Sequence, residues 1–280
     1  MAPKISTYMS TPVIAATPYD NLAHIRKLMI RHHIGRIVIV EGNKPIGIIT
    51  KSDFIRALFS RRRFAKPLEE IKAEEVMTRD LIKIDENRSI KAAAKLMVRK
   101  GVSGLPVVSK SGELVGIITL TDITRAYAER YPGRVFVKEA MRTSVPTVHR
   151  THSLFYVAEL VSRDEAGKIV VVDGDKPIGI ITKSDIAFIN PFLLGYRDMK
   201  YVRRFSSEKG RATAIRIYTI PIAGDIMTPD LLTVGLDEDL ALAADTMIKN
   251  NISALPVVDS DGNLAGIVTK IEIAKTLTRI

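Results

Sequence analysis

Four near-copies of one segment run through the chain, and this repetition constrains the fold more than any other feature. The phrase Gly-Ile-Ile-Thr, or Gly-Ile-Val-Thr in the last copy, precedes an acid at Gly47–Asp53, Gly116–Asp122, Gly179–Asp185 and Gly266–Glu272. A methionine lies 44 or 45 residues before each acid, at Met9, Met77, Met141 and Met227. This regular spacing predicts four small modules in tandem.

Each copy predicts the same order of elements. A short β-prone segment follows the Met, and a helix with apolar residues at three- and four-residue spacing comes next, as at Leu22, Ile25 and Met29. A buried-type strand such as Ile37–Val40, a tight polar turn and a second strand follow, and a closing helix starts at the Thr. The predicted fold is therefore α/β (α+β), with four β-α-β-β-α modules.

The copies are of two kinds. The segments 44–53 and 176–185 are identical, whereas the second and fourth copies share Leu-Pro-Val-Val. An ancestral pair was duplicated, so the predicted functional unit is a pair, roughly 1–135 and 136–280. We predict modules at 1–66, 67–135, 136–190 and 225–280, with a basic connector at 191–224.

The repeated motif resembles that of the CBS domain. Met9-Ser10, Met77-Thr78 and Met227-Thr228 fit the resemblance, and Met141-Arg142 departs from it. The resemblance covers nearly the whole chain and implies two Bateman units, each a pair of CBS modules, assembled into a flat disk. It further implies an energy-sensing regulator, similar to archaeal proteins, that binds AMP, ADP, ATP or S-adenosylmethionine in the clefts between paired modules.

The Thr-x-x-Asp spacing permits two interpretations. A helix amino terminus suits phosphate, the acid can accept hydrogen bonds from ribose, and the Lys after the Thr can neutralise phosphate. The same spacing is a helix capping box, which Thr269-x-x-Glu272 fits especially well. Leu120 leaves the second site without that lysine. The predicted nucleotide contacts are Thr50, Lys51, Asp53, Thr119, Asp122, Thr182, Lys183, Asp185, Thr269, Lys270 and Glu272.

The resemblance also implies an apolar slot for adenine. Its predicted walls are Val13, Ile14, Ile34 and Ile37 in the first copy and Val145, Pro146 and Ile169 in the third. Ordinary core packing is the alternative for these residues. Arg36 and Lys168 precede the second strand and either reach phosphate across the cleft or extend to solvent.

Charge adds a hypothesis about partners. Lys and Arg number 42 against 31 Asp and Glu, and the net charge of +11 attracts polyanions. Two connectors combine basic and aromatic residues, as RNA-binding segments do, although a solvated linker is the alternative. The predicted RNA contacts are Arg61, Arg62, Arg63, Lys66, Arg197, Lys200, Arg203, Arg204, Lys209, Arg211 and Arg216.

Two functions remain open from the sequence. One is a nucleotide-responsive protein that binds ribosomal RNA or the ribosome. The other is a regulatory subunit of a kinase, metabolic enzyme or transporter. No nucleophile–base set or Walker loop is present, so we predict no enzyme activity.

There is no cysteine, and we expect no metal site, because His32, His33, His149 and His152 lack acid or thiol partners. Neither a signal pattern nor a membrane-spanning run is present, so we predict a cytoplasmic protein without a membrane partner; a homodimer is left open.

Overall fold

The computed structural model describes residues 3–59, 66–189, 200–205, 212–217 and 221–280. Module 1 comprises η1 (Ile5–Thr7), β1 (Ala15–Ala16), α1 (Leu22–Arg31), β2 (Arg36–Glu41), β3 (Lys44–Thr50) and α2 (Lys51–Phe59). Module 2 comprises η2 (Leu68–Glu70), η3 (Ala73–Glu75), β4 (Ile84–Asp85), α3 (Ile90–Lys100), β5 (Gly104–Val108), β6 (Leu114–Thr119) and α4 (Leu120–Arg130). Module 3 comprises α5 (Val137–Ala140), β7 (Thr147–His149), α6 (Leu154–Arg163), β8 (Lys168–Asp173), β9 (Lys176–Thr182) and α7 (Lys183–Ala187). Module 4 comprises α8 (Ala223–Ile226), β12 (Val234–Gly235), α9 (Leu240–Lys249), β13 (Ala254–Val258), β14 (Leu264–Thr269) and α10 (Lys270–Arg279).

Each module contains one three-stranded sheet. The first strand pairs parallel with the second, and the second pairs antiparallel with the third. The predicted β-α-β-β-α order and the α/β class are therefore confirmed. The first strand is shorter than the β-prone segment suggested, because only Ala15 and Ala16 pair in module 1 and the residues before them turn toward module 2.

The first long helix of every module begins at a polar N-cap in the same relative position. The side chains of Asn21, Ser89, Ser153 and Asp239 accept hydrogen bonds from backbone N–H groups in the first turn of α1, α3, α6 and α9. These bonds satisfy donors that a helix start otherwise leaves unpaired, so the caps define where each helix starts.

In modules 1 and 2, the residue that follows the methionine of one module pairs with a strand of the other. Ser10 of module 1 forms a β-bridge to Ile117 in β6, and Thr78 of module 2 forms one to Ile48 in β3. The methionine of one module packs against the motif glycine of the other, so that a Cβ on Gly47 would lie 3.0 Å from Met77 Cγ. Modules 3 and 4 repeat these contacts, which explains why Met and Gly recur together in the sequence.

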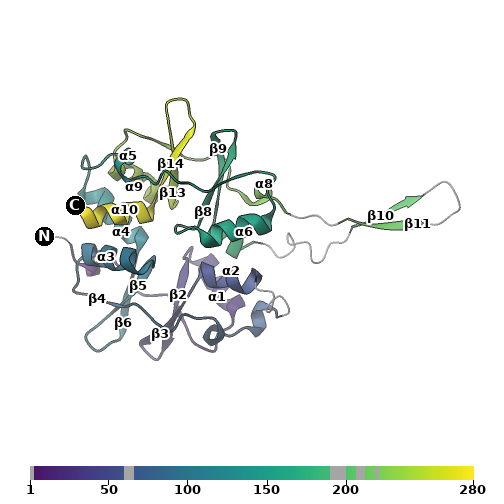
Figure 1. Ribbon diagram of the computed structural model, residues 1–280. Coiled ribbons are helices and arrows are strands. Elements are labelled where there is room, and N and C mark those ends of the chain that lie inside the picture. Colours follow the sequence, from purple (N-terminus) through teal and green to yellow (C-terminus); the bar gives the residue numbers. More distant parts are fainter. Residues whose placement is uncertain (1–2, 60–65, 190–199, 206–211, 218–220) are drawn as a thin grey trace.

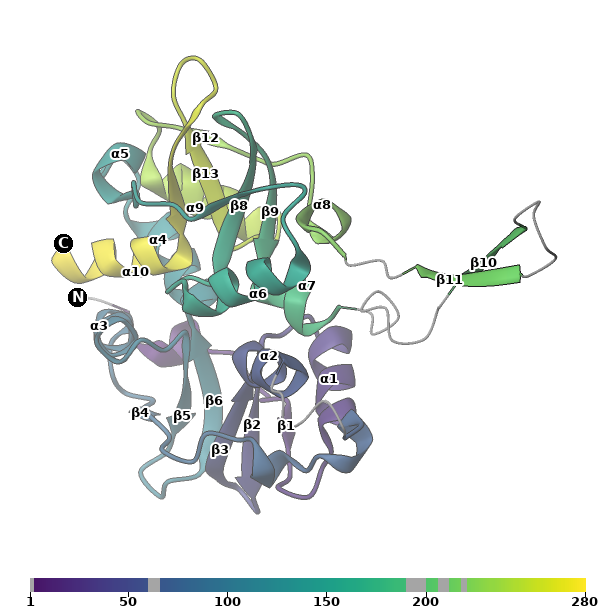
Figure 2. The same ribbon diagram turned by 45° about the vertical axis from the view of Figure 1, so that its right-hand side comes forward.

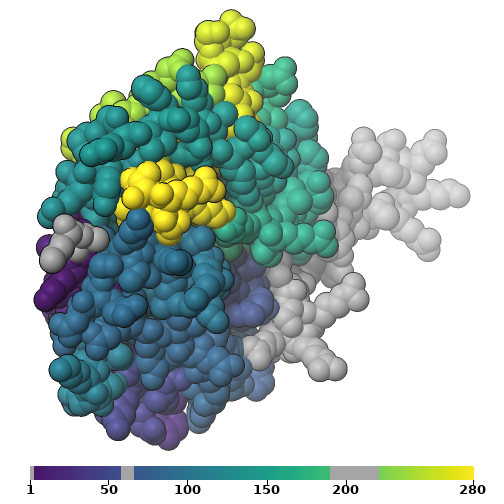
Figure 3. All heavy atoms as spheres, turned by 60° about the vertical axis from the view of Figure 1, so that its left-hand side comes forward, coloured from purple at the N-terminus to yellow at the C-terminus, as the bar shows by residue number. Residues whose placement is uncertain are grey.

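Helices join the two pairs at the centre of the molecule. One core combines modules 1 and 3, including Phe54 and Ile186, and a second combines modules 2 and 4, including Tyr127 and Leu277. Figure 1 shows α4, α6 and α10 between the strands of an upper half, β8, β9, β13 and β14, and those of a lower half, β2, β3, β5 and β6. Figure 3 shows α10 at the seam between the halves. Module 1 thus faces module 3, and module 2 faces module 4.

The predicted basic connector contains a hairpin that the sequence analysis did not anticipate. Strands β10 (Lys200–Phe205) and β11 (Ala212–Ile217) pair antiparallel, with Lys200 opposite Ile217 and Phe205 opposite Ala212. Figure 2 shows the two strands beside the four modules rather than within one of their sheets. The limits assigned to the modules and the connector stay a prediction.

Candidate ligand-binding clefts

The motif acid caps the closing helix in every module. Asp53 Oδ2 accepts hydrogen bonds from Thr50 N at 2.6 Å and Thr50 Oγ1 at 2.8 Å. Asp122 and Asp185 make the same two contacts with Thr119 and Thr182. Capping therefore occupies one carboxylate oxygen and leaves the second oxygen for another partner.

The second oxygen distinguishes the four sites. Asp53 Oδ1 pairs with Arg56, and Asp122 Oδ1 lies 3.4 Å from Arg125 Nη1. Among the described residues, Asp185 makes only its contacts to the Thr182 cap, and it is less buried than Asp53. Asp185 is therefore the motif acid with the most open oxygen.

The motif acid of module 4 is a glutamate that is also buried and caps its own helix. Glu272 is 5% exposed and bonds both Thr269 N and Thr269 Oγ1. Lys275 Nζ lies 3.8 Å from its other oxygen. The longer side chain thus folds back on its own helix, as the capping interpretation expects.

Lysines at the helix starts reach across the seam between the two halves. Lys51 Nζ of module 1 donates to Ser184 Oγ of module 3 at 2.6 Å. Lys270 Nζ of module 4 donates to Thr121 Oγ1 of module 2 at 3.0 Å. The site of module 2, where Leu120 replaces the lysine, therefore does have a cation nearby. That cation is Lys270, which belongs to module 4.

Arg36 and Lys168 each donate a hydrogen bond within the chain. Arg36 Nη2 crosses from module 1 to module 2 and donates to Ser103 Oγ at 2.8 Å, passing so close to Gly104 that a Cβ there would contact the guanidinium. Lys168 is 9% exposed, and its Nζ donates to Ala166 O at 3.1 Å. Lys168 is therefore buried, whereas Arg36 is half-buried and links modules 1 and 2.

These basic side chains form what we call the central cation cluster, namely Arg36, Lys51, Lys168, Lys183 and Lys270. Burial lowers the pKa of all five, that of Arg36 to about 10 and those of Lys168 and Lys270 to about 8. Neighbouring cations lower the pKa values of three of them further. Within the described part of the chain, none of the five forms an ion pair.

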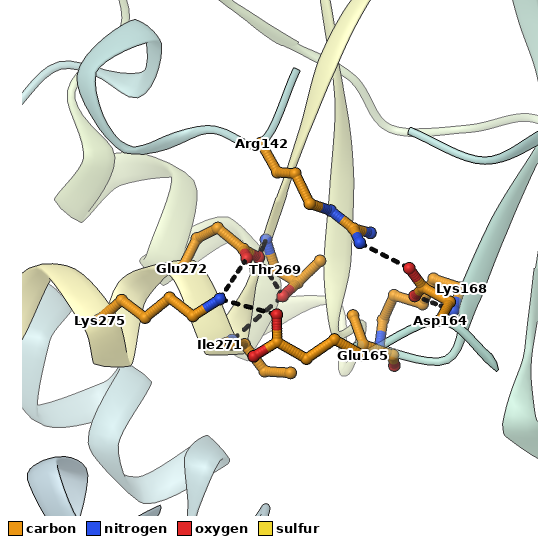
Figure 4. Close-up of polar contacts among 9 residues, drawn as sticks. Arg142, Asp164, Glu165, Lys168, Thr269, Ile271, Glu272 and Lys275 are labelled. Atoms are coloured by element: carbon orange, nitrogen blue, oxygen red, sulfur yellow. Dashed lines mark hydrogen bonds and ion pairs between the residues drawn. The ribbon is translucent and has the colours of Figure 1, made fainter. Parts of the chain in front are cut away.

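A polar network joins modules 3 and 4 (Figure 4). Arg142 Nη1 pairs with Asp164 Oδ1 at 2.5 Å, and Asp164 Oδ2 accepts from Lys168 N at 3.0 Å. Lys275 Nζ lies 2.8 Å from Glu165 Oε2. These partners were not predicted from the sequence, although the departure from the motif at Arg142 was a signal.

The predicted adenine walls divide into two groups. Ile37 and Ile169 are fully buried and belong to the core that joins modules 1 and 3. Val13, Ile14, Ile34, Val145 and Pro146 retain some exposure. The role of all seven in binding adenine stays a prediction.

An open cavity of about 610 Å³ lies between modules 1 and 2. Pro45 and Ile46 line one side, and residues 79–83 line the other. Leu81 and Ile82 in that segment stand where module 1 has Val13 and Ile14. The cavity therefore offers an apolar surface in module 2 that the sequence analysis did not name.

The predicted RNA contacts lie mostly outside the described residues. This applies to Arg61, Arg62, Arg63, Arg197, Lys209 and Arg211. Lys200, Arg203, Arg204 and Arg216 belong to β10 and β11, for which the structure describes the backbone, and Lys66 is exposed.

Two further kinds of feature are absent from the described residues. No helix there combines the length and apolar character that crossing a bilayer requires. No group of three or more His, Asp or Glu side chains in that part of the chain is placed to hold a metal ion.

Comparison with known proteins agrees with the fold and the repeats. The family model described as CBS domain matches residues 5–60, 73–129, 137–189 and 223–279. The uncharacterized protein MJ1225 of Methanocaldococcus jannaschii is 27% identical over 250 residues, which cover 85% of each chain. The uncharacterized protein MJ0653 of the same organism is 46% identical over 125 residues, covering 45% of this chain and 62% of its own. The crystal structure of MJ1225 has a TM-score of 0.80 to this chain at 22% identity, covering 98% of this chain and 99% of that one.

Proposed function

The chain belongs to the CBS-domain family, and from this premise we propose that it is a regulatory protein that binds adenine nucleotides in the clefts between its paired modules. The central cation cluster is the observation that carries the proposal. Five partly or fully desolvated basic groups without a carboxylate in an ion pair are costly, because desolvation removes part of their hydration and no salt bridge replaces it. The phosphates of a bound nucleotide would supply that compensation.

The surrounding groups suit the rest of a nucleotide. Helices α2, α4, α7 and α10 each begin directly after a motif Thr, and the positive end of a helix dipole favours phosphate there. The open oxygen of Asp185 can accept hydrogen bonds from ribose hydroxyls, and Asp53 can do so if Arg56 turns away. Leu81 and Ile82 offer an apolar surface for adenine.

Nucleotide binding would alter contacts between the two halves. A phosphate that draws Lys51 from Ser184, or Lys270 from Thr121, removes a hydrogen bond that joins modules of opposite pairs. A ligand that changes such contacts shifts the relative position of the halves, which a protein partner can detect. The crystal structure of MJ1225 was presented as that of a candidate archaeal homolog of g-AMPK, which supports a regulatory partner of this kind.

Isothermal titration calorimetry with AMP, ADP, ATP and S-adenosylmethionine tests the binding proposal. Asp185→Ala and Asp53→Ala should each weaken nucleotide binding on the order of tenfold, since each removes hydrogen bonds between ribose and a charged acceptor. Glu159→Ala, on the exposed face of α6, is the matched control. Unchanged affinity in both Asp variants, with the fold intact, would limit Thr-x-x-Asp to helix capping.

Binding of RNA or the ribosome stays a second proposal, which rests on the net charge and the basic connector. Binding should weaken steeply with salt, because phosphate contacts release counterions. A pull-down from cell extract, with and without nuclease, separates the alternatives. A protein partner that survives nuclease treatment would favour the regulatory subunit, whereas ribosomal particles lost with nuclease would favour the RNA-binding protein.

A further inference from the structure

The cleft between modules 3 and 4 contains a residue pair that module 1 lacks. Arg142 follows Met141 at the position that Ser10 occupies in module 1, and Asp164 caps the C-terminus of α6 where His32 caps that of α1. The motif segments of modules 1 and 3 are identical over ten residues. The two sites therefore share the motif but differ in the groups that surround it.

Asp164 holds the Arg142 side chain in place. The carboxylate is 4% exposed, bonds Nη1 of the guanidinium at 2.5 Å, and is itself fixed by the backbone N–H of Lys168 at 3.0 Å. Both oxygens of Asp164 are thus engaged. A buried, doubly bonded carboxylate fixes the orientation of the guanidinium, as a positioning residue does for a binding group.

The remaining donors of Arg142 have no partner. Nε and Nη2 are buried and make no hydrogen bond within the described part of the chain. These two atoms form one side of the guanidinium, which can bind two oxygens of a carboxylate or phosphate through two parallel N–H···O bonds. A buried donor without an acceptor is costly, so this side of Arg142 is suited to a group that arrives from outside the chain.

The surrounding charges do not supply that acceptor. Glu272 uses one oxygen for Thr269, and Glu165 pairs with Lys275 (Figure 4). Burial lowers the pKa of Arg142, but Asp164, and after it Glu272 and Glu165 through space, raise that pKa; neither glutamate forms a hydrogen bond with Arg142 in the described part of the chain. Because Nε and Nη2 are enclosed, a ligand must open the cleft to reach them.

We propose that Arg142, positioned by Asp164, binds the oxyanion of an adenosine ligand in the cleft between modules 3 and 4 and makes this cleft different from the one between modules 1 and 2. This inference rests on the proposed function. The oxyanion is a phosphate in a nucleotide and a carboxylate in S-adenosylmethionine. Both present two oxygens in the geometry that the Nε and Nη2 donors require.

Calorimetry on the full chain with AMP, S-adenosylmethionine and adenosine tests the proposal. Adenosine carries no oxyanion and serves as the neutral probe. Arg142→Ser, which installs the module 1 residue, should weaken one class of sites about ten- to a hundredfold for the oxyanion ligand, since a charge-assisted bidentate contact is lost. Arg142→Lys, which keeps the charge but not the two parallel donors, should lose much of the same affinity. Adenosine binding should not change.

Two further variants separate binding from folding. Arg163→Ser removes an exposed arginine of α6 and should leave all three titrations as in the unsubstituted protein. Asp164→Asn keeps the shape of the positioning residue and should produce a smaller loss than Arg142→Ser. Thermal unfolding of each variant verifies that the modules remain folded.

The outcomes distinguish the inference from the function on which it rests. A loss for AMP alone identifies phosphate as the partner of Arg142, and a loss for S-adenosylmethionine alone identifies carboxylate. Equal losses for adenosine and the charged ligands, or no loss in Arg142→Ser and Arg142→Lys, would overturn the inference. If the unsubstituted protein binds none of the three ligands, the proposed function itself is wrong.

Discussion

Lys168 and Lys270 connect phosphate binding to pH. Burial lowers the pKa of each to about 8, so both lose their protons close to neutral pH. A phosphate attracts the ammonium form, and nucleotide affinity should therefore fall as the pH rises through about 8. Calorimetry between pH 7 and pH 9.5, in buffers of different ionisation enthalpy, should also detect proton uptake on binding.

The same groups affect stability in the opposite direction. An unfolded chain keeps lysine protons up to a pKa of about 10.4, so it binds more protons than the folded protein above pH 8. The free energy of unfolding without nucleotide should thus increase from pH 8 toward pH 10. Lys168→Met combined with Lys270→Met should abolish both trends, and a pH-independent affinity in the unsubstituted protein would contradict this explanation.

Tyr127 provides a test of a single buried hydroxyl. Its Oη is enclosed and has no hydrogen-bond partner in the described part of the chain, and burial raises its pKa to about 12. Tyr127→Phe should leave the free energy of unfolding unchanged or raise it by up to about 1 kcal/mol. Tyr8→Phe is the matched comparison, because Tyr8 Oη donates to Glu129 at 2.6 Å and its loss should cost about 1 kcal/mol. Denaturant titrations measure both values, and a destabilised Tyr127→Phe would indicate a partner for that hydroxyl.

At the scale of the elements, the two modules of a pair contact each other where the methionine of one packs against the motif glycine of the other. A Cβ on Gly47 would lie 3.0 Å from Met77 Cγ, so Gly47→Ala should destabilise the protein by about 1–3 kcal/mol through overpacking. Gly235→Ala is the control, since its nearest neighbour would be Glu238 Oε1 at an ordinary 3.4 Å. Chemical denaturation of both variants gives the comparison.

The double variant Gly47→Ala with Met77→Ala refines this prediction. If the clash is the cause, shortening the methionine should recover part of the loss at Gly47, and the two effects should not add. Additive losses would mean that the glycine acts through its backbone conformation instead.

The order of elements within a module was predictable, because each helix and strand has its own periodicity and turn residues. The short helices α5 and α8 were not, since four residues are too few to show a period. Both begin a module by packing on the other member of the pair, as the bridge from Phe136 to Asp239 shows for α5. Local patterns carry little information about such contacts.

At the scale of the whole molecule, contacts between modules were also the part of the candidate site that the sequence did not predict. The motif acids, the lysines and Arg36 were predicted from their repeat positions. Ser184 and Thr121 were missed, because their bonds to lysines join modules of opposite pairs. Arg142 and Asp164 were also missed, although they belong to one module, since 21 residues separate them in the chain. Sequence repeats indicate which residues recur, but only the packing of the four modules shows which of these residues contact one another.

The two halves should differ in how they associate when separated. Each half exposes the apolar helix faces that form the two cores in the full chain, and each is an approximate copy of its partner. Residues 1–135 alone should therefore form a homodimer. In it, Lys51 of one copy can donate a hydrogen bond to Ser52 of the other, which holds the position of Ser184.

Residues 136–280 should dimerise less tightly than residues 1–135. In the full chain Lys270 bonds Thr121, whereas in this homodimer it would meet Ile271, which has no hydroxyl, and a second Lys270. Two half-buried cations would then face each other without an acceptor, which opposes association. Sedimentation equilibrium of both fragments measures the difference, and Lys270→Leu in the second fragment should strengthen its dimer. Equal dimerisation constants, or no effect of Lys270→Leu, would show that the seam between the halves depends on apolar packing and not on the central cation cluster.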